Sequence, residues 1–371
     1  MPHLTVAVDV GPLHGRRTGV AVATAGMVDG LGQRSDVTVA PFLVSYRARP
    51  VPPQRRMPLP AGLAMRAWAH SSYPRADRWL GNVEVVHGTN YVAPPSRLPT
   101  VVSVYDCWFL EHPDQAAPAV RRAARVLHRA VRRGARVHVS SHATATAAAE
   151  LLSTDRISVV HLGPPPPPPP PPTAPVGQVP PAPDFLGGHP FIVAIGTTER
   201  RKDVPSLVAA FGIIAASRPD LRLVIAGAPG DDHHRVLAAV GDLEASVRSR
   251  AHVTGTVDGP TKEALLAHAE ALVYPSLDEG FGFPVLEAQR AGTAVVARRA
   301  GSIPEVAGDA AELVDPGTPD ALAEGIIRVI DHQSRRDHLR TAGRCNVDRF
   351  SWERCAAEMV EVYRQAIEEQ S

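Results

Sequence analysis

The sequence predicts an α/β protein made of two doubly wound domains, each a parallel sheet with helices on both faces. Three observations support this prediction. Short apolar runs rich in β-branched residues recur along the chain, helical patterns lie between several of them, and a proline tract divides the chain near its middle. Strands that are apolar throughout are typical of parallel sheets buried on both faces. The length of 371 residues also fits two domains.

The first half of the chain contains six short apolar runs that we expect to form parallel strands. They are Leu4–Val8, Val37–Phe42, Val83–Val86, Val101–Tyr105, Val137–Ser140 and Ile157–Val160. Helical patterns separate several of them, for example over Val20–Leu31 and Pro118–Arg133. This alternation predicts one doubly wound domain.

The second half repeats the scheme and ends in an additional helix. Its expected strands are Phe191–Ile195, Leu221–Ala226, Ala271–Tyr274, Ala294–Ala297 and Glu312–Val314. Its expected helices are Val204–Ser217, His233–Arg250, Thr261–His268 and Pro319–Asp331, followed by an amphipathic helix over Phe350–Gln370. In such sheets, ligands bind outside the carboxyl ends of the strands. We therefore expect the site there, in a cleft between two facing domains.

Nine consecutive prolines, Pro164–Pro172, mark the boundary between the halves. Such a tract favours an extended polyproline spacer, here interpreted as a surface insertion, with a docking segment for a proline-binding partner as the alternative. The predicted parts are residues 1–163 as the N-terminal domain, 164–187 as a proline-rich linker, 188–350 as the C-terminal domain and 351–371 as the last helix.

The two halves carry opposite charges. Residues 1–163 contain 19 arginines and no lysine against 10 acidic residues, whereas residues 164–371 contain 20 basic and 28 acidic residues. A uniform basic load typical of nucleic-acid binders is absent from the sequence, so we expect no nucleic-acid partner. The oligomeric state stays open.

The cysteines and the hydropathy of the sequence indicate the cellular compartment of the protein. The three cysteines, Cys107, Cys345 and Cys355, are far apart, which excludes a disulfide scaffold and a cysteine-based zinc site. No apolar run approaches the ~20 residues of a membrane span, and the N-terminus does not resemble a signal peptide. We expect a cytoplasmic protein, with peripheral contact at the inner membrane face as the alternative.

The strongest motif runs from Tyr274 to Glu287 and reads YPSLDEGFGFPVLE. It predicts a strand, a glycine-rich loop and a helix with Pro284 in its first position. Gly280 and Gly282 allow the backbone to approach a ligand, and a helix N-terminus favours an anion. The carboxylates of Glu279 and Glu287 suit sugar hydroxyls, which donate hydrogen bonds. A site that suits both a phosphate and a polyol predicts that the ligand is a sugar nucleotide.

A second motif follows the strand Phe191–Ile195 and reads GTTERRK, from Gly196 to Lys202. Gly196 and Thr197 begin a turn at a strand end, and cationic side chains after such a turn suit a diphosphate. Arg201 and Lys202 can neutralise charge on a leaving group. The spacing does not fit the P-loop pattern.

Together these motifs resemble the retaining glycosyltransferases of the GT-B fold that carry the E-x7-E motif, in particular mannosyltransferase-like group 1 members. Further matching segments are Arg17–Val20, Val86–Asn90, Asp106, His112–Asp114, Val253–Val257, Gly301–Glu305 and Ser351–Trp352. The resemblance implies two Rossmann-like domains facing across a cleft. It also implies that the last helix crosses back to pack on the N-terminal domain.

The resemblance implies roles for the residues of the site. Arg201 and Lys202 would hold the donor diphosphate, Glu279 the hydroxyls of the transferred sugar, and Glu287 the ribose hydroxyls. The remaining donor contacts would come from backbone groups: Phe281, Gly282 and Phe283 at the phosphate and sugar, Gly255, Thr256 and Val257 near the base, and Gly19 closing on the phosphates from the other domain. No metal or other cofactor would be obligatory.

One position departs from the family pattern. Where the family often has a His-Asp pair, this chain has Tyr105-Asp106, and we treat both residues as catalytic candidates. Tyrosine donates a hydrogen bond but is bulkier and does not titrate near neutral pH. A double displacement would need a nucleophilic carboxylate, for which Asp9 and Asp106 are candidates by position. His87, at another strand end, is interpreted as a structural histidine.

The acceptor would bind the basic N-terminal domain. Five arginines recur at helical spacing: Arg122, Arg125, Arg129, Arg132 and Arg136. Such a helix is either a solvated face or a contact with anionic lipid. The aromatic and proline-rich stretch from Arg47 to Arg78 fits a saccharide acceptor or ordinary packing.

The leading hypothesis is therefore a hexosyltransferase that moves mannose from GDP-mannose to a saccharide or glycolipid acceptor and forms an α-glycosidic bond. A UDP-glucose-type hexosyltransferase and a catalytically silent sugar-nucleotide-binding protein are the alternatives. A nucleotide-sugar epimerase and a glycoside hydrolase are disfavoured, the first by the E-x7-E string and the second by a site suited to diphosphate.

Overall fold

The structure is a computed structural model that describes residues 3–15, 18–168 and 180–370. It divides into two compact units. The first unit comprises residues 1–165 and 350–371, and the second comprises residues 166–349. Arg17 and the prolines from Pro169 to Pro172 lie outside the described residues.

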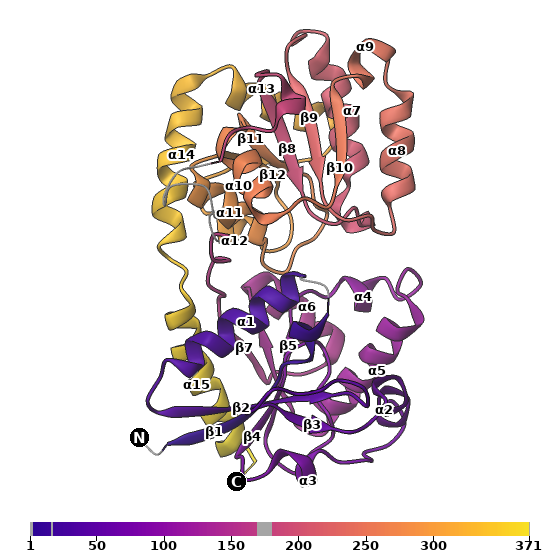
Figure 1. The fold of residues 1–371 in the computed structure, drawn as a ribbon, viewed down its shortest axis with the longest axis vertical. Helices are drawn as coiled ribbons and strands as arrows, with labels where there is room; N and C mark the ends of the chain where they lie inside the picture. Colours follow the sequence, from indigo (N-terminus) through magenta and orange to yellow (C-terminus); the bar gives the residue numbers. More distant parts are fainter. Residues whose placement is uncertain (1–2, 16–17, 169–179, 371) are drawn as a thin grey trace. The chain divides into compact units, whose positions relative to one another are not determined.

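The first unit is built on a parallel sheet of seven strands in the order β3-β2-β1-β4-β5-β6-β7 (Figure 1). The strands are β1 Leu4–Asp9, β2 Val37–Val44, β3 Arg55–Met57, β4 Val85–Gly88, β5 Thr100–Val104, β6 Arg136–Val139 and β7 Ile157–Val159. The helices are η1 Gly11–His14, α1 Gly19–Gly32, α2 Ala61–Trp68, α3 Asp77–Leu80, α4 Trp108–Glu111, α5 Pro118–Arg132, α6 His142–Leu152 and α15 Trp352–Glu368.

The second unit is built on a parallel sheet of six strands in the order β10-β9-β8-β11-β12-β13. The strands are β8 Phe191–Ile195, β9 Arg222–Ala226, β10 Ala251–Gly255, β11 Ala271–Tyr274, β12 Ala294–Arg298 and β13 Glu312–Val314. The helices are η2 Asp184–Leu186, η3 Arg200–Lys202, α7 Val204–Ala215, α8 His233–Asp242, α9 Ala245–Arg248, α10 Gly259–His268, α11 Phe283–Ala291, α12 Ile303–Ala307, α13 Pro319–Ile330 and α14 Gln333–Val347.

Helices cover both faces of the second sheet, which explains its continuous apolar strands. Ile192 and Val273 pack into one buried cluster with α7 and α13. Their neighbours Val193 and Leu272 pack into another cluster with α10 and α11. Because successive side chains of a strand point to opposite faces, each strand must be apolar at every position. The predicted doubly wound α/β fold is confirmed for both units.

The strand order also determines where a ligand can bind. In the second sheet the order reverses between β8 and β11, and in the first it reverses between β1 and β4. A crevice forms at such a reversal, outside the carboxyl ends of the two strands. In the second unit this edge carries Gly196, which follows β8, and Tyr274, which ends β11.

Helix α15 packs on the first unit, as the resemblance implied. It lies beside α1 in Figure 1, and the two helices are in contact. The indole of Trp352 covers Gly26 of α1 and donates a hydrogen bond of 2.9 Å to the carbonyl of Pro164. Arg364 pairs with Asp36 at 3.3 Å. The predicted return of the last helix is therefore confirmed.

The sequence missed two of the four edge strands, β3 and β10, and it missed helix α14. Edge strands are short and tolerate charge because only one neighbour pairs with them. In β3 both arginines, Arg55 and Arg56, are exposed, and β10 is half-buried throughout. Neither segment therefore shows the continuous apolar run that identifies a central strand.

Several predicted boundaries are wrong. The single helix predicted over His233–Arg250 is two helices, because the extended backbone of Leu243 ends α8. The strand predicted over Val83–Val86 lies at Val85–Gly88, and Pro284 is the second rather than the first residue of α11. Arg136 does not continue the basic helix. It begins β6, since the chain turns at Gly134 with a φ of 92°.

Candidate functional site

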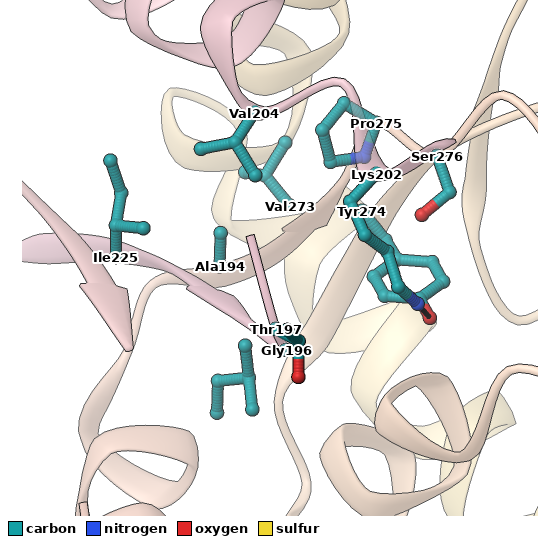
Figure 2. Close-up of a pocket in the computed structure, with 11 residues that line it drawn as sticks. Ala194, Gly196, Thr197, Lys202, Val204, Ile225, Val273, Tyr274, Pro275 and Ser276 are labelled. Atoms are coloured by element: carbon teal, nitrogen blue, oxygen red, sulfur yellow. Dashed lines mark hydrogen bonds between the residues drawn. The ribbon is translucent and has the colours of Figure 1, made fainter. Parts of the chain in front are cut away.

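The GTTERRK motif forms a tight turn at the carboxyl end of β8. Gly196 has a φ of 147°, in the region that favours glycine. A Cβ at Gly227 would lie 1.7 Å from the carbonyl oxygen of Gly196, so the next strand end approaches this turn closely. Thr197 follows in the turn, and η3 then carries Arg201 and Lys202 back toward the strand ends. Figure 2 shows Gly196, Thr197 and Lys202 around one pocket.

The glycine-rich motif links β11 to α11. Gly282 is the residue before the helix and has a φ of 90°, and a Cβ there would lie 2.7 Å from Ile303. Glycine is therefore required at this position by conformation and by space. The loop places Gly280, Phe281 and Phe283 at the start of a nine-residue helix. The N-terminus of such a helix favours an anion.

The two motifs meet at Glu279. Its carboxylate is buried and pairs with Arg201 at 2.9 Å and with the ammonium of Lys202. The same ammonium donates a hydrogen bond of 2.6 Å to the hydroxyl of Tyr274. Two consecutive cations and a carboxylate 77 positions from Lys202 therefore form one cluster at the reversal of strand order.

The two cations of this cluster keep the carboxylate of Glu279 ionised. Burial by itself would raise the pKa of Glu279, but Arg201 and Lys202 outweigh that effect and lower the pKa to about 2. Burial lowers the pKa of Lys202, and the charge of Arg201 adds to this, while Glu279 opposes it. The carboxylate is therefore ionised at neutral pH and can accept hydrogen bonds from hydroxyl groups.

Glu287, one turn into α11, has a cation of its own. Its carboxylate is buried and pairs with the ammonium of Lys262 on α10. Gly255, Thr256 and Val257 directly precede Asp258. The side chain of Asp258 caps the first turn of α10. Gly255 ends β10 with a φ of 70°, and Val257 packs against the buried cluster beneath α11. This predicted segment therefore leads directly into α10, the helix whose Lys262 pairs with Glu287.

The pocket at this edge is lined by both apolar and polar side chains. Ala194, Val204, Ile225 and Val273 form its apolar part, while Lys202, Tyr274 and Ser276 supply the polar groups (Figure 2). The buried hydroxyl of Ser276 faces Glu279 and helps to keep the pKa of that carboxyl low.

Tyr274, Ser276 and Lys262 also lie at the site but were not predicted from the sequence. Tyr274 and Ser276 stand inside the motif from Tyr274 to Glu287, and their alternation along an extended segment was the available signal. The signal for Lys262 was composition, since the chain contains only two lysines.

The remaining predicted residues belong to the first unit. Gly19 is the first residue of α1, whose start is capped by the side chain of Thr18. Tyr105 follows β5 with its ring buried against His138, and its buried hydroxyl lies near the hydroxyls of Ser103 and Thr24. Asp106 accepts a hydrogen bond of 3.0 Å from Tyr91. The roles of Gly19, Tyr105 and Asp106 stay predictions.

His87 has the structural surroundings that were expected. It is fully buried, with one ring nitrogen 2.8 Å from the hydroxyl of Tyr363 and the other 2.8 Å from the hydroxyl of Ser103. Both nitrogens are therefore satisfied inside the first unit.

Among the described residues, no group of three or more His, Cys, Asp or Glu side chains is arranged to hold a metal ion. No helix in the same part of the chain combines the length and apolar character that a bilayer crossing requires.

The second unit of this chain matches a known protein family. Residues 180–345 match the family model described as glycosyl transferases group 1. The O-antigen chain mannosyltransferase B of Escherichia coli is 33% identical over 182 residues, which cover 48% of this chain and 47% of that protein. The MMP alpha-(1->4)-mannosyltransferase of Mycolicibacterium hassiacum is 35% identical over 182 residues, covering 47% of this chain and 43% of that protein. The matches thus span about half the length of these curated relatives.

Solved structures resemble the chain over nearly its whole length. Sucrose-phosphate synthase from Thermosynechococcus elongatus has a TM-score of 0.71 and 17% identity, with 98% of this chain and 99% of that chain covered. The Anabaena HepE protein in complex with UDP and glucose has a TM-score of 0.69 and 15% identity, with 98% and 100% covered.

The two parallel sheets, their strand orders and this structural likeness define a protein with the GT-B fold. Residues 180–345, in the second unit, are similar to the group 1 glycosyltransferases.

Proposed function

We propose that this chain is a retaining glycosyltransferase that moves a hexose from a nucleotide-sugar donor to a saccharide or glycolipid acceptor. The observation that carries the proposal is the cluster of Arg201, Lys202 and Glu279 at the carboxyl ends of β8 and β11. The two cations suit a diphosphate, and the buried carboxylate suits the hydroxyls of a sugar. A donor that carries both groups side by side is a nucleotide sugar.

GDP-mannose is the donor that we propose first. The curated relatives include two mannosyltransferases, and the Gly-Thr-x-x-x-Arg-Lys form of the second motif resembles mannosyltransferase-like members. UDP-glucose is the alternative donor. In either case Glu287 would accept hydrogen bonds from the ribose, and Gly255, Thr256 and Val257 would lie near the base.

The main requirement of this reaction is that the protein stabilises the leaving group. When the anomeric carbon–oxygen bond of the donor breaks, negative charge develops on the nucleoside diphosphate. Arg201, Lys202 and the N-terminus of α11, at Gly282 and Phe283, would stabilise that charge. The acceptor hydroxyl would attack on the face from which the diphosphate departs and pass its proton to the leaving phosphate. The product would be an α-glycoside, formed without an obligatory metal.

The acceptor would bind the first unit. Its α5 presents arginines along one side, among them Arg122, Arg125, Arg129 and Arg132. A basic amphipathic helix can rest on an anionic membrane surface, which would suit a glycolipid acceptor. Peripheral contact with a membrane therefore remains part of this proposal.

One observation favours a second candidate function. The hydroxyl of Tyr105, which stands where the family often has histidine, is buried, and burial raises its pKa above the ordinary value. A tyrosine held in this way offers neither a titratable group nor an exposed donor to a sugar. A silent sugar-nucleotide-binding protein would tolerate this arrangement.

The test combines binding and turnover. Thermal unfolding would be followed with GDP, UDP, ADP and their sugar conjugates in the absence of metal. A ligand at 100 times its dissociation constant adds about 2.7 kcal/mol to the free energy of unfolding. Stabilisation by GDP and GDP-mannose, together with acceptor-dependent release of GDP, supports the proposal. Preference for UDP compounds selects the alternative donor, binding without turnover selects the silent protein, and no binding contradicts all three.

A further inference from the structure

The chain contains two lysines among its 39 basic Lys and Arg residues, Lys202 and Lys262. Each pairs with one glutamate of the E-x7-E motif, Lys202 with Glu279 and Lys262 with Glu287. The protein thus uses arginine at every other such cationic position and lysine only at these two. Lys202 belongs to the site already described, whereas no role has been assigned to Lys262.

The contact between Lys262 and Glu287 joins α10 to α11. The carboxylate side chain is 7% exposed and the lysine side chain is 29% exposed. The more exposed ammonium of Lys262 therefore contacts the nearly buried carboxylate of Glu287. Within the described residues, the only ion pair of Glu287 is the one with Lys262.

A buried carboxylate that binds neutral hydroxyl groups needs a cation from elsewhere. The ribose diol would donate hydrogen bonds to Glu287 but would bring no positive charge, and the adjoining diphosphate would add negative charge. A buried charge without a partner is strongly disfavoured. The ammonium of Lys262 can supply that partner in both the free and the ligand-bound protein.

The choice of lysine also leaves room for the ligand. An ionised carboxylate has about four lone-pair positions. Lys262 contacts one oxygen, Oε1, so positions remain for two ribose hydroxyls. A guanidinium tends to occupy both oxygens of a carboxylate at once and would compete with the diol.

We propose that Lys262 is a positioning residue of the nucleoside subsite. It holds the carboxylate of Glu287 oriented toward the ribose of the donor. This inference rests on the proposed function, because it assumes that Glu287 binds a nucleotide.

The first experiment measures the affinities of GDP, UDP and inorganic pyrophosphate by calorimetry for the wild type and for Lys262→Met. Methionine retains most of the stem and removes the charge. We expect the affinity for the preferred nucleoside diphosphate to fall at least about tenfold, the size expected for a lost charged partner. The affinity for pyrophosphate should change less than about twofold, since Lys202 and Arg201 are intact.

The same two helices provide a matched control. Arg290 on α11 pairs with Glu263 on α10 at 3.7 Å. Arg290→Met therefore weakens another ion pair between these helices without touching Glu287. We expect it to leave both affinities unchanged. If Arg290→Met weakens GDP binding as much as Lys262→Met does, Lys262 acts through helix packing and the proposal is wrong.

A measurement on the wild type covers the case in which Lys262→Met does not fold. When the lysines are labelled with ¹³C, the NMR spectrum contains one set of side-chain signals for each of the two lysines. The spectrum of Lys202→Met assigns these signals, because it lacks the set of Lys202. The Lys262 signal should shift on adding GDP or UDP and stay in place on adding pyrophosphate. An unmoved Lys262 signal, or an unchanged Lys262→Met affinity, overturns this inference alone. Failure of the wild type to bind any nucleoside diphosphate overturns the proposed function as well.

Discussion

His87 and Tyr363 are 276 positions apart in the chain, yet a ring nitrogen of His87 lies 2.8 Å from the hydroxyl of Tyr363. The other nitrogen of His87 lies 2.8 Å from the hydroxyl of Ser103, which is also 2.8 Å from a ring nitrogen of His138. Three neighbouring strands and helix α15 are thereby joined in one buried polar network. The last helix is held to the first unit by specific hydrogen bonds as well as by apolar contact.

This network makes stability depend on pH. Burial lowers the pKa of His138 from 6.5 to about 4, although a hydrogen bond to Val160 opposes it, and burial also lowers the pKa of His87. The unfolded chain therefore binds these protons at a higher pH than the folded chain does. Stability should be full above pH 6.5 and fall between pH 6.5 and 4, by roughly 3 kcal/mol for His138 alone. Urea unfolding across this range measures the slope, which His138→Asn should flatten. Equal slopes for the two proteins would contradict the assignment.

The hydroxyl of Tyr363 should contribute measurably to stability. Tyr363→Phe keeps the ring and leaves a buried nitrogen of His87 without its partner, which costs about 1–3 kcal/mol. Chemical unfolding at neutral pH gives the difference directly. Tyr46 is 66% exposed, so Tyr46→Phe serves as the control and should have no effect. A stability loss of the same size in both variants would argue against the network.

Gly26 on α1 is predicted to reject alanine. Within a helix, alanine is normally more favourable than glycine by about 1 kcal/mol. Here a Cβ would lie 2.2 Å from the ring of Trp352, and overpacking costs about 1–3 kcal/mol. We expect the clash to prevail and Gly26→Ala to lower the melting temperature. Gly32 at the end of the same helix has nothing within 4 Å of its Cβ position, so Gly32→Ala should be neutral or stabilising. A stabilised Gly26→Ala would disprove this packing of α15.

Lys202→Ala should separate diphosphate binding from nucleoside binding. Glu279 keeps its contact with Arg201 at 2.9 Å, so the loop should retain its structure. Calorimetry should show a loss of at least about tenfold in affinity for the nucleoside diphosphate and little change for the nucleoside. Equal affinity of the variant and the wild type for the diphosphate would remove Lys202 from the donor site.

Glu279→Ala should affect transfer more than binding of the bare nucleotide. The carboxylate is proposed to bind the transferred sugar, which the nucleoside diphosphate lacks. Turnover with the sugar conjugate should therefore fall by more than the diphosphate affinity does. Unchanged transfer kinetics would show that Glu279 does not contact the sugar.

The local pattern of the sequence was sufficient for much of the fold and for the main site motifs. Apolar runs such as Ile192–Ile195 indicate a buried strand because both faces of the sheet are covered. The glycine at position 282 indicates a tight turn before a helix, and the structure places it at a φ of 90°. These properties depend on neighbours in the sequence. Edge strands such as β10 escaped prediction because half-buried strands lack a continuous apolar run.

Contacts between distant residues were decided by the tertiary structure alone. The sequence by itself determined the doubly wound class, the positions of the two motifs and the residue types suited to a diphosphate and a sugar. It did not determine that Lys262 pairs with Glu287, that Tyr274 accepts a hydrogen bond from Lys202, or that His87 faces Tyr363. Such partners follow from strand order and helix packing, which bring together side chains that no local spacing relates. Local periodicity specifies which face of an element is buried, but only the assembled fold specifies what that face meets.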